Sequence, residues 1–177
     1  MMRSRVNDIL PSLLITLVLL LVLEVASSLI PILGIFEYRL PFNILIVLYL
    51  SFRLETPFLP VLVLFIQYIH SFFSIEGWAM GTLAGTLVCI LCNYLRELIH
   101  LNSIPVTILT TQLFQLIWFG IVSLMIYMKT GETHYVIIKF GRFLPESILM
   151  SLISPFLFSF LEKIWRSRDE GILGGSN

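Results

Sequence analysis

The sequence has few charged residues. Asp, Glu, Lys and Arg make up 12% of the 177 residues, whereas hydrophobic residues make up 58%. Soluble domains carry about 25% charged residues, so a chain this poor in charge cannot cover an apolar core with a polar surface in water. The 11 basic and 11 acidic residues also cancel, which leaves no net charge to attract nucleic acid. Composition therefore excludes a soluble globule, a nucleic-acid-binding protein and a disordered chain, and it indicates a protein that lies in lipid.

Residues in patterns typical of catalysis or metal binding are also scarce. The two cysteines, Cys89 and Cys92, form a C-x-x-C pair inside an apolar run, where a thiolate is disfavoured, so we interpret them as small buried residues. The three histidines follow no metal-ligand spacing, and the sequence contains no Gly-x-Ser-x-Gly motif and no phosphate-binding loop. We therefore expect no catalytic centre, no metal site and no cofactor.

Long apolar runs are abundant. A helix needs about 20 apolar residues to cross a hydrocarbon core of about 30 Å, and runs of this kind recur along the chain. We expect an all-α fold, a polytopic membrane protein with a bundle of six transmembrane helices. The expected spans are Pro11–Ile30, Pro41–Phe52 (or a longer second span from Ile32), Pro57–Phe73, Gly77–Leu95, Pro105–Met128 and Phe143–Leu161. Four of them begin at a proline, which fits the first turn of a helix.

An even number of spans places both termini on one side of the membrane. That side then carries Arg3, Arg5, Arg53, Arg96, Lys163, Arg166 and Arg168, and the other side carries Arg39, Lys129, Lys139 and Arg142. By the positive-inside rule, both termini are expected in the cytoplasm. Residues 1–166 are expected to form a single membrane domain, and residues 167–177 a disordered cytoplasmic tail. The longest connection, Lys129–Arg142, predicts a small extracytoplasmic element with Lys139 and Arg142 in a candidate partner-binding loop.

Three glycines at four-residue spacing form the strongest local pattern. Gly77, Gly81 and Gly85 are continued at the same spacing by Cys89 and Asn93. Residues four apart share a helix face, so the pattern predicts a groove of small side chains along which another helix packs closely. We favour a contact inside one subunit. A dimer seam and a contact with a different membrane protein stay open as alternatives.

Polar residues inside the expected spans form a second pattern. They are Glu24, Asn43, Gln67, His70, Ser71, Gln112 and Gln115. A charged side chain at the centre of a membrane helix costs about 2.5–3.5 kcal/mol on insertion scales, so these groups are expected to pair inside the bundle. We interpret them as an internal hydrogen-bond network that sets the register of the helices. The alternative is that they line a pocket for a small polar solute or a proton path.

Two stretches resemble one bacterial family. The run Leu40-Pro41-Phe42-Asn43, continued by apolar residues to Leu50 and later by Gly77 and a helix of small residues, resembles the rod-shape protein family MreD. Ser154-Pro155-Phe156-Leu157, followed by the basic exit Leu161–Arg166, resembles the last helix of that family. One stretch departs from the family: Val63–Gln67 lacks the glycine and aspartate that members often carry before the polar turn.

The resemblance to MreD implies a non-enzymatic scaffold in the bacterial inner membrane that helps to maintain cell shape and organise peptidoglycan synthesis. Its implied partners are an MreC-like single-span membrane protein and, through it, an actin-like filament protein and a peptidoglycan synthase pair. The family is similar in fold to the substrate-binding subunits of energy-coupling-factor transporters. That similarity gives the alternative function, a subunit that binds a small, vitamin-type solute for transport.

Overall fold

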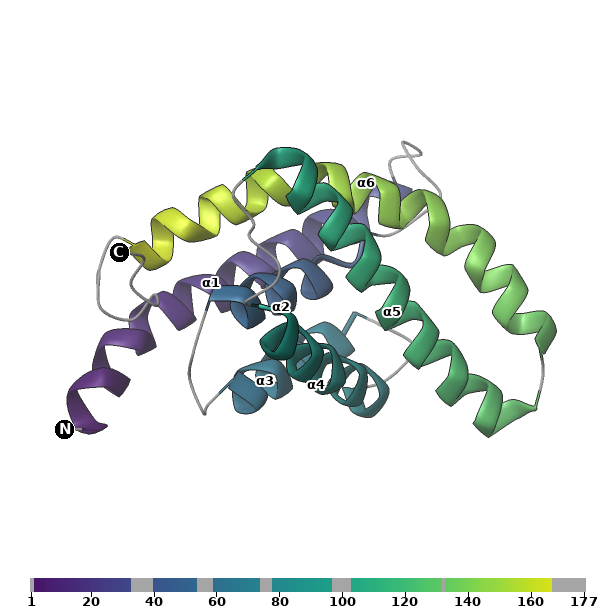
Figure 1. The fold of residues 1–177 in the computed structure, drawn as a ribbon, viewed down its shortest axis with the longest axis horizontal. Helices are drawn as coiled ribbons and strands as arrows, with labels where there is room; N and C mark the ends of the chain where they lie inside the picture. The colour runs from purple at the N-terminus through teal and green to yellow at the C-terminus, as the bar shows by residue number, and fades with distance from the viewer. Residues whose placement is uncertain are drawn as a thin grey trace.

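The computed structural model describes residues 2–32, 40–53, 59–73, 78–96, 103–131 and 133–166. Within these residues the chain forms α1 (Met2–Ile32), α2 (Phe42–Arg53), α3 (Leu59–Ser71), α4 (Trp78–Leu95), α5 (Ile104–Thr130) and α6 (Thr133–Arg166). The described part of the chain is therefore all-helical, as predicted (Figure 1). The expected tail, residues 167–177, lies outside the described residues.

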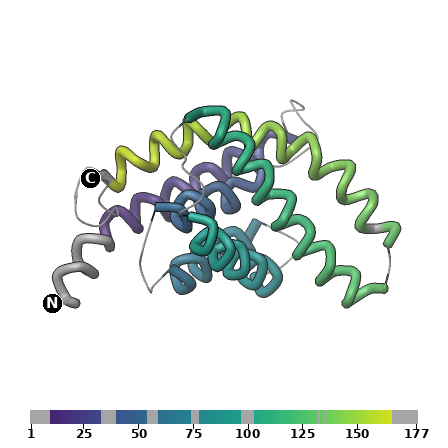
Figure 2. The backbone as a smooth tube through the Cα atoms, viewed as in Figure 1, coloured from purple at the N-terminus to yellow at the C-terminus, as the bar shows by residue number. Residues whose placement is uncertain are grey.

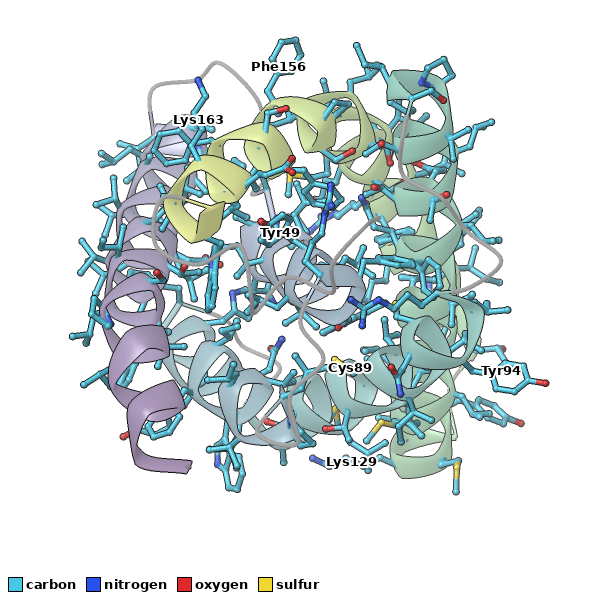
Figure 3. All side chains as sticks on the ribbon, turned by 60° about the vertical axis from the view of Figure 1, so that its left-hand side comes forward. Tyr49, Cys89, Tyr94, Lys129, Phe156 and Lys163 are labelled. Atoms are coloured by element: carbon cyan, nitrogen blue, oxygen red, sulfur yellow. The ribbon has the colours of Figure 1, made fainter. Side chains whose placement is uncertain are left out.

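Helix α2 is the centre of the bundle. It packs against each of the other five helices, and those five close a ring around it, in the order α1, α3, α4, α5, α6 and back to α1. Figure 3 shows this arrangement, with Tyr49 of α2 in the middle, α1 on the left, α6 above, and α3 and α4 below. Five helices therefore face the surroundings, and one is enclosed.

The sequence of α2 explains its central place. Every residue from Phe42 to Phe52 is buried, because the helix is apolar on all sides and has no polar face to turn outward. Its 12 residues reach only about 18 Å at 1.5 Å per residue. Since helices rather than lipid surround α2, this short length does not expose its polar backbone ends to hydrocarbon.

Four helices contain stretches long and apolar enough to cross a membrane. They are Leu10–Ile32, Trp78–Leu95, Ile104–Thr130 and Val136–Trp165, and they indicate an integral membrane protein. The expected count of six spans is not confirmed, because the described helices α2 and α3 have only 12 and 13 residues. Helices of that length fall short of the roughly 20 residues that a crossing needs.

Several prolines lie inside helices rather than at their starts. Pro11, expected to begin the first span, lies within α1, which also contains Pro31. Helix α6 contains Pro145 and Pro155, and Figure 1 shows it following an arc over the bundle. Each proline removes one helical N–H and bends the helix, which membrane helices tolerate when neighbouring helices support them. Pro105 does occupy the first turn of α5, as expected.

The expected loop between Lys129 and Arg142 is mostly helix. Helix α5 continues to Thr130, and Gly131 ends it with a left-handed backbone (φ 71°) whose N–H donates to the Tyr127 carbonyl over 2.8 Å. Helix α6 begins at Thr133, so Lys139 and Arg142 lie on a helix and not in a loop. Glycine adopts this backbone conformation without strain, so α5 ends directly before it.

The part of α1 that follows Leu10 and the end of α6 lie at the same end of the bundle (Figure 2). Ser12 Oγ donates to the Ile164 carbonyl over 3.5 Å, and Trp165 Nε1 donates to Thr16 Oγ1 over 3.2 Å. These contacts join two segments that are about 150 positions apart in the sequence. They close the ring of five helices around α2.

Candidate functional site

Gly81 of the expected groove contacts a polar side chain of α3. A Cβ atom built on Gly81 would lie 2.5 Å from Gln67 Oε1, a separation that real Cβ atoms essentially never show. The missing side chain therefore makes room for the amide of Gln67. This contact brings α3 and α4 together inside one subunit.

Gly85 contacts two helices at once. A Cβ atom there would lie 2.8 Å from Val63 Cγ1 of α3 and 3.0 Å from Trp118 Cη2 of α5. One turn further, Cys89 is buried, and its Sγ lies 2.7 Å from Ser51 Oγ of α2. The face that begins with Gly81 thus packs against three neighbouring helices in succession.

The groove does not extend to the last residue assigned to it. Asn93 is exposed, because residues four apart in a helix of 3.6 residues per turn rotate by roughly 40° at each step. After three steps from Gly81, Asn93 has turned by roughly 120° and has left the packed face. Gly77, the first residue of the predicted pattern, lies outside the described residues.

A polar layer joins α1, α2 and α3 near one end of the bundle. Glu24 is fully buried, and its Oε1 lies 2.8 Å from Nδ1 of His70. One turn further along α1, Ser27 Oγ donates to the Leu40 carbonyl over 2.9 Å, while Leu40 N–H donates to the same hydroxyl oxygen over 2.8 Å. These bonds attach the segment just before α2 to α1.

Asn43 and Gln67 form the other half of this layer. Asn43 Nδ2 donates to Gln67 Oε1 over 3.2 Å, and both side chains are buried. Gln67 and His70 lie three positions apart on α3, so their two contacts are neighbours on one helix face. Among the described residues, Asn43 Oδ1 and Gln67 Nε2 have no hydrogen-bond partner. The layer therefore holds one unused acceptor and one unused donor.

Three predicted members of the network lie outside this layer. Ser71 is partly exposed, because it is the last residue of α3. Its hydroxyl donates to the Tyr68 carbonyl of the same helix. Gln112 and Gln115 lie on α5, which is not a neighbour of α1 or α3 in the ring of described helices. The single network expected from the sequence is thus divided into separate clusters.

Gln112 and Gln115 belong to a polar ladder between α5 and α6. Gln112 Nε2 donates to Ser147 Oγ over 3.0 Å, and Ser151 Oγ donates to Gln112 Oε1 over 2.7 Å. Gln115 Nε2 also donates to Ser151 Oγ, over 3.4 Å. Ser147 and Ser151, four positions apart on α6, are not among the residues that the sequence predicted for this network.

A charged cluster at the end of α2 was not predicted either. Arg53 Nη2 lies 3.5 Å from Glu162 Oε2 of α6, and Arg96 Nη2 donates to the Arg53 carbonyl over 3.2 Å. Because the Arg53 and Glu162 side chains are 38% and 34% exposed, their ion pair contributes little to stability. The cluster instead places a guanidinium against the carbonyl end of α2, where positive charge is favoured.

Lys139 and Arg142, the predicted partner-binding residues, lie near the beginning of α6. Lys139 is partly buried and Arg142 is exposed, and both act electrostatically on Glu146 of the same helix. They are thus part of an intrahelical charge group rather than two free cations on a loop. The structure presents Arg142 to the surroundings more than Lys139.

The described polar clusters join neighbouring helices to each other. Cys89 and Cys92 are buried free cysteines, and within the described ranges no group of three or more His, Cys, Asp or Glu side chains could hold a metal ion. The fold and these clusters define a helical integral membrane protein. No family model, no curated protein and no solved structure matches this chain. The resemblance to MreD therefore depends only on the two stretches of sequence described above.

Proposed function

We propose that this chain is a non-enzymatic scaffold of the bacterial cell-elongation machinery, a protein of the MreD kind. It lies in the inner membrane with both termini in the cytoplasm and helps to organise peptidoglycan synthesis. Its direct partner is an MreC-like single-span membrane protein. Through that partner it is linked to an actin-like filament protein and a peptidoglycan synthase pair.

One observation carries the proposal: the polar side chains inside the bundle bind each other between helices. Glu24 contacts His70, Asn43 contacts Gln67, and Gln112 contacts two serines of α6. Such bonds fix which helices are neighbours and in which register, at about 0.6 kcal/mol each in membrane proteins. A bundle with this interior supports a function that depends on its shape and outer surfaces.

Depletion of the protein in the native bacterium tests the proposal. We expect depleted cells to become round, and the wild-type chain isolated in mild detergent to retain a single-span partner. Cells that express Gly81→Leu in place of the wild-type chain should stay round, because leucine cannot fit against Gln67. Gly120→Leu is the matched control, since nothing lies within 4 Å of a Cβ atom at Gly120. Rod-shaped depleted cells would refute the proposal.

A second candidate function is favoured by the two unpaired amide atoms. A buried polar atom without a partner costs about 1–3 kcal/mol, and Asn43 Oδ1 and Gln67 Nε2 are both in this state among the described residues. A solute that offers a donor and an acceptor together would satisfy both. If depletion abolishes uptake of one small solute and leaves the cells rod-shaped, the chain is a solute-binding transport subunit instead.

A further inference from the structure

Two neighbouring amide side chains of the polar layer share only one hydrogen bond. Asn43 Nδ2 donates to Gln67 Oε1 over 3.2 Å, whereas Asn43 Oδ1 and Gln67 Nε2 have no partner among the described residues. Two amides that meet edge to edge can exchange two hydrogen bonds, so this pair makes one of the two that it could make. The pair therefore presents one acceptor and one donor to a third group.

Rotation of the amides does not remove this mismatch. Turning the Asn43 amide by about 180° would place two oxygens against each other, and turning the Gln67 amide would place two nitrogens against each other. Turning both amides reverses the bond and again leaves one oxygen and one nitrogen without a partner. With one bond between the amides, a third group must therefore always donate one hydrogen bond and accept another.

The two unpaired atoms are shielded from the surroundings. Asn43 is 3% exposed and Gln67 is 1% exposed. Lipid cannot satisfy their hydrogen bonds, because hydrocarbon contains neither donors nor acceptors. The hydroxyl of Ser27 in the same layer is already used, since it both donates to and accepts from the backbone of Leu40. Buried polar atoms in this situation typically bind ordered water.

The packing around Gln67 favours a molecule as small as water. A Cβ atom on Gly81 would lie 2.5 Å from Gln67 Oε1, so even one added carbon atom does not fit on the α4 side without displacing the amide. The oxygen and nitrogen of one amide are about 2.2 Å apart, so the 3.2 Å bond keeps Asn43 Oδ1 and Gln67 Nε2 within about 8 Å of each other. Water bridges separations of this size with hydrogen bonds of about 2.8 Å.

We propose that ordered internal water completes the hydrogen bonds of Asn43 and Gln67, donating to the unpaired oxygen and accepting from the unpaired nitrogen. The water then joins α2 and α3 in addition to the direct bond between the amides. The inference is independent of the proposed scaffold function, because it depends only on the geometry of the two amides. It competes with the solute-binding function, since water and a solute would bind the same two atoms.

Magnetisation transfer from water to protein protons tests this inference. The full chain, uniformly labelled with ¹⁵N, is studied in deuterated detergent micelles, and Gln67→Met identifies the side-chain signal of Gln67 by its loss. We expect a cross-peak between water and the Nε2 protons of Gln67, with the sign of a direct contact rather than of proton exchange in rotating-frame spectra. The backbone N–H of Leu48 is the internal control and should show no such cross-peak, because this residue of α2 is 1% exposed.

Two substitutions separate bound water from other sources of the signal. Asn43→Leu removes the acceptor, so the water cross-peak of Gln67 should be lost. Asn93→Leu removes an exposed amide of α4 and is the matched control, in which the cross-peak should persist. The remaining ¹⁵N signals check that both variants keep the fold. If Asn43→Leu does not fold, the wild-type spectrum decides the question by itself.

A wild-type spectrum without a water cross-peak at Gln67, or with an equal cross-peak at Leu48, would overturn the inference. A cross-peak from a co-purified solute in place of water would also overturn it and would support the solute-binding function. Persistence of the water signal in folded Asn43→Leu would contradict the role of Asn43 as the acceptor. The shape of depleted cells has no influence on these spectra, so failure of the scaffold function and failure of this inference are distinguishable.

Discussion

The side-chain oxygen of Gln67 lies too close to Gly81 for a Cβ atom to fit there without displacing it. That atom would lie 2.5 Å from Gln67 Oε1, and the same oxygen accepts a hydrogen bond from Asn43 over 3.2 Å. The buried amide of Gln67 thus accepts a hydrogen bond from α2, and it packs closely against α4 because Gly81 has no side chain. A side chain at position 81 would therefore have to displace the Gln67 amide.

Gly81→Ala should destabilise the protein by about 1–2 kcal/mol, because the new methyl group forces the Gln67 amide away from Asn43. The measurement is the free energy of unfolding in mixed micelles titrated with sodium dodecyl sulfate. Gly120→Ala is the control: nothing lies within 4 Å of its Cβ position, so alanine should leave stability unchanged or raise it by up to about 1 kcal/mol. Equal effects of the two substitutions would show that the Gln67 contact has no energetic consequence.

Gly85→Ala should cost more than Gly81→Ala. Its methyl group would meet Val63 and the ring of Trp118, both buried, and neither has the freedom of a glutamine amide to move aside. We expect a loss of about 2–3 kcal/mol in the same unfolding titration. Adding Val63→Ala should restore part of this loss, because it removes the methyl group nearest to the new side chain. A double variant no more stable than Gly85→Ala would contradict this packing.

The sequence predicts the helices well and their partners poorly. Apolar runs predict the bounds of α4 and α5 nearly to the residue. A long apolar run with polar residues at both ends can form a membrane helix in only one way, because the polar ends fix where the helix begins and ends. The order of the helices in the ring around α2 cannot be predicted in this way, because any apolar helix face can pack against any other. Gln112 therefore binds Ser147 and Ser151 rather than the polar residues of α3, and its spacing on α5 contains no information about that choice.

Serine and arginine contacts were missed for a related physical reason. A serine in a membrane helix can satisfy its own hydroxyl, as Ser147 does with the Leu144 carbonyl, so it does not signal a partner. Arg53 and Arg96 lie at helix ends, where the bilayer surface alone accounts for a positive charge. Their mutual contact depends on α2 and α4 ending at the same level, which becomes evident only in three dimensions.

Glu24 and His70 should behave as a coupled pair. Glu24→Leu leaves the imidazole of His70 without this carboxylate, and His70→Leu leaves a buried carboxylate without this imidazole, so each change should cost about 1–3 kcal/mol. The double variant should cost less than the sum of the two single variants, by about 1 kcal/mol. Unfolding titrations of the four proteins measure this coupling. Strict additivity would mean that the 2.8 Å contact does not join α1 and α3 energetically.

Ser151 should matter more than any exposed serine of α6. Its hydroxyl donates to Gln112 and accepts from Gln115, so Ser151→Ala breaks two bonds between α5 and α6 and leaves Gln112 Oε1 and Gln115 Nε2 without these partners. Interhelical hydrogen bonds in membrane proteins contribute about 0.6 kcal/mol each and up to about 1.7 kcal/mol, so a loss of about 1–2 kcal/mol is expected in the unfolding titration. Ser159→Ala, at an exposed position of the same helix, is the matched control and should change stability by less than about 0.5 kcal/mol. If the two variants unfold alike, the ladder between α5 and α6 does not stabilise the bundle, and van der Waals packing alone holds these two helices together.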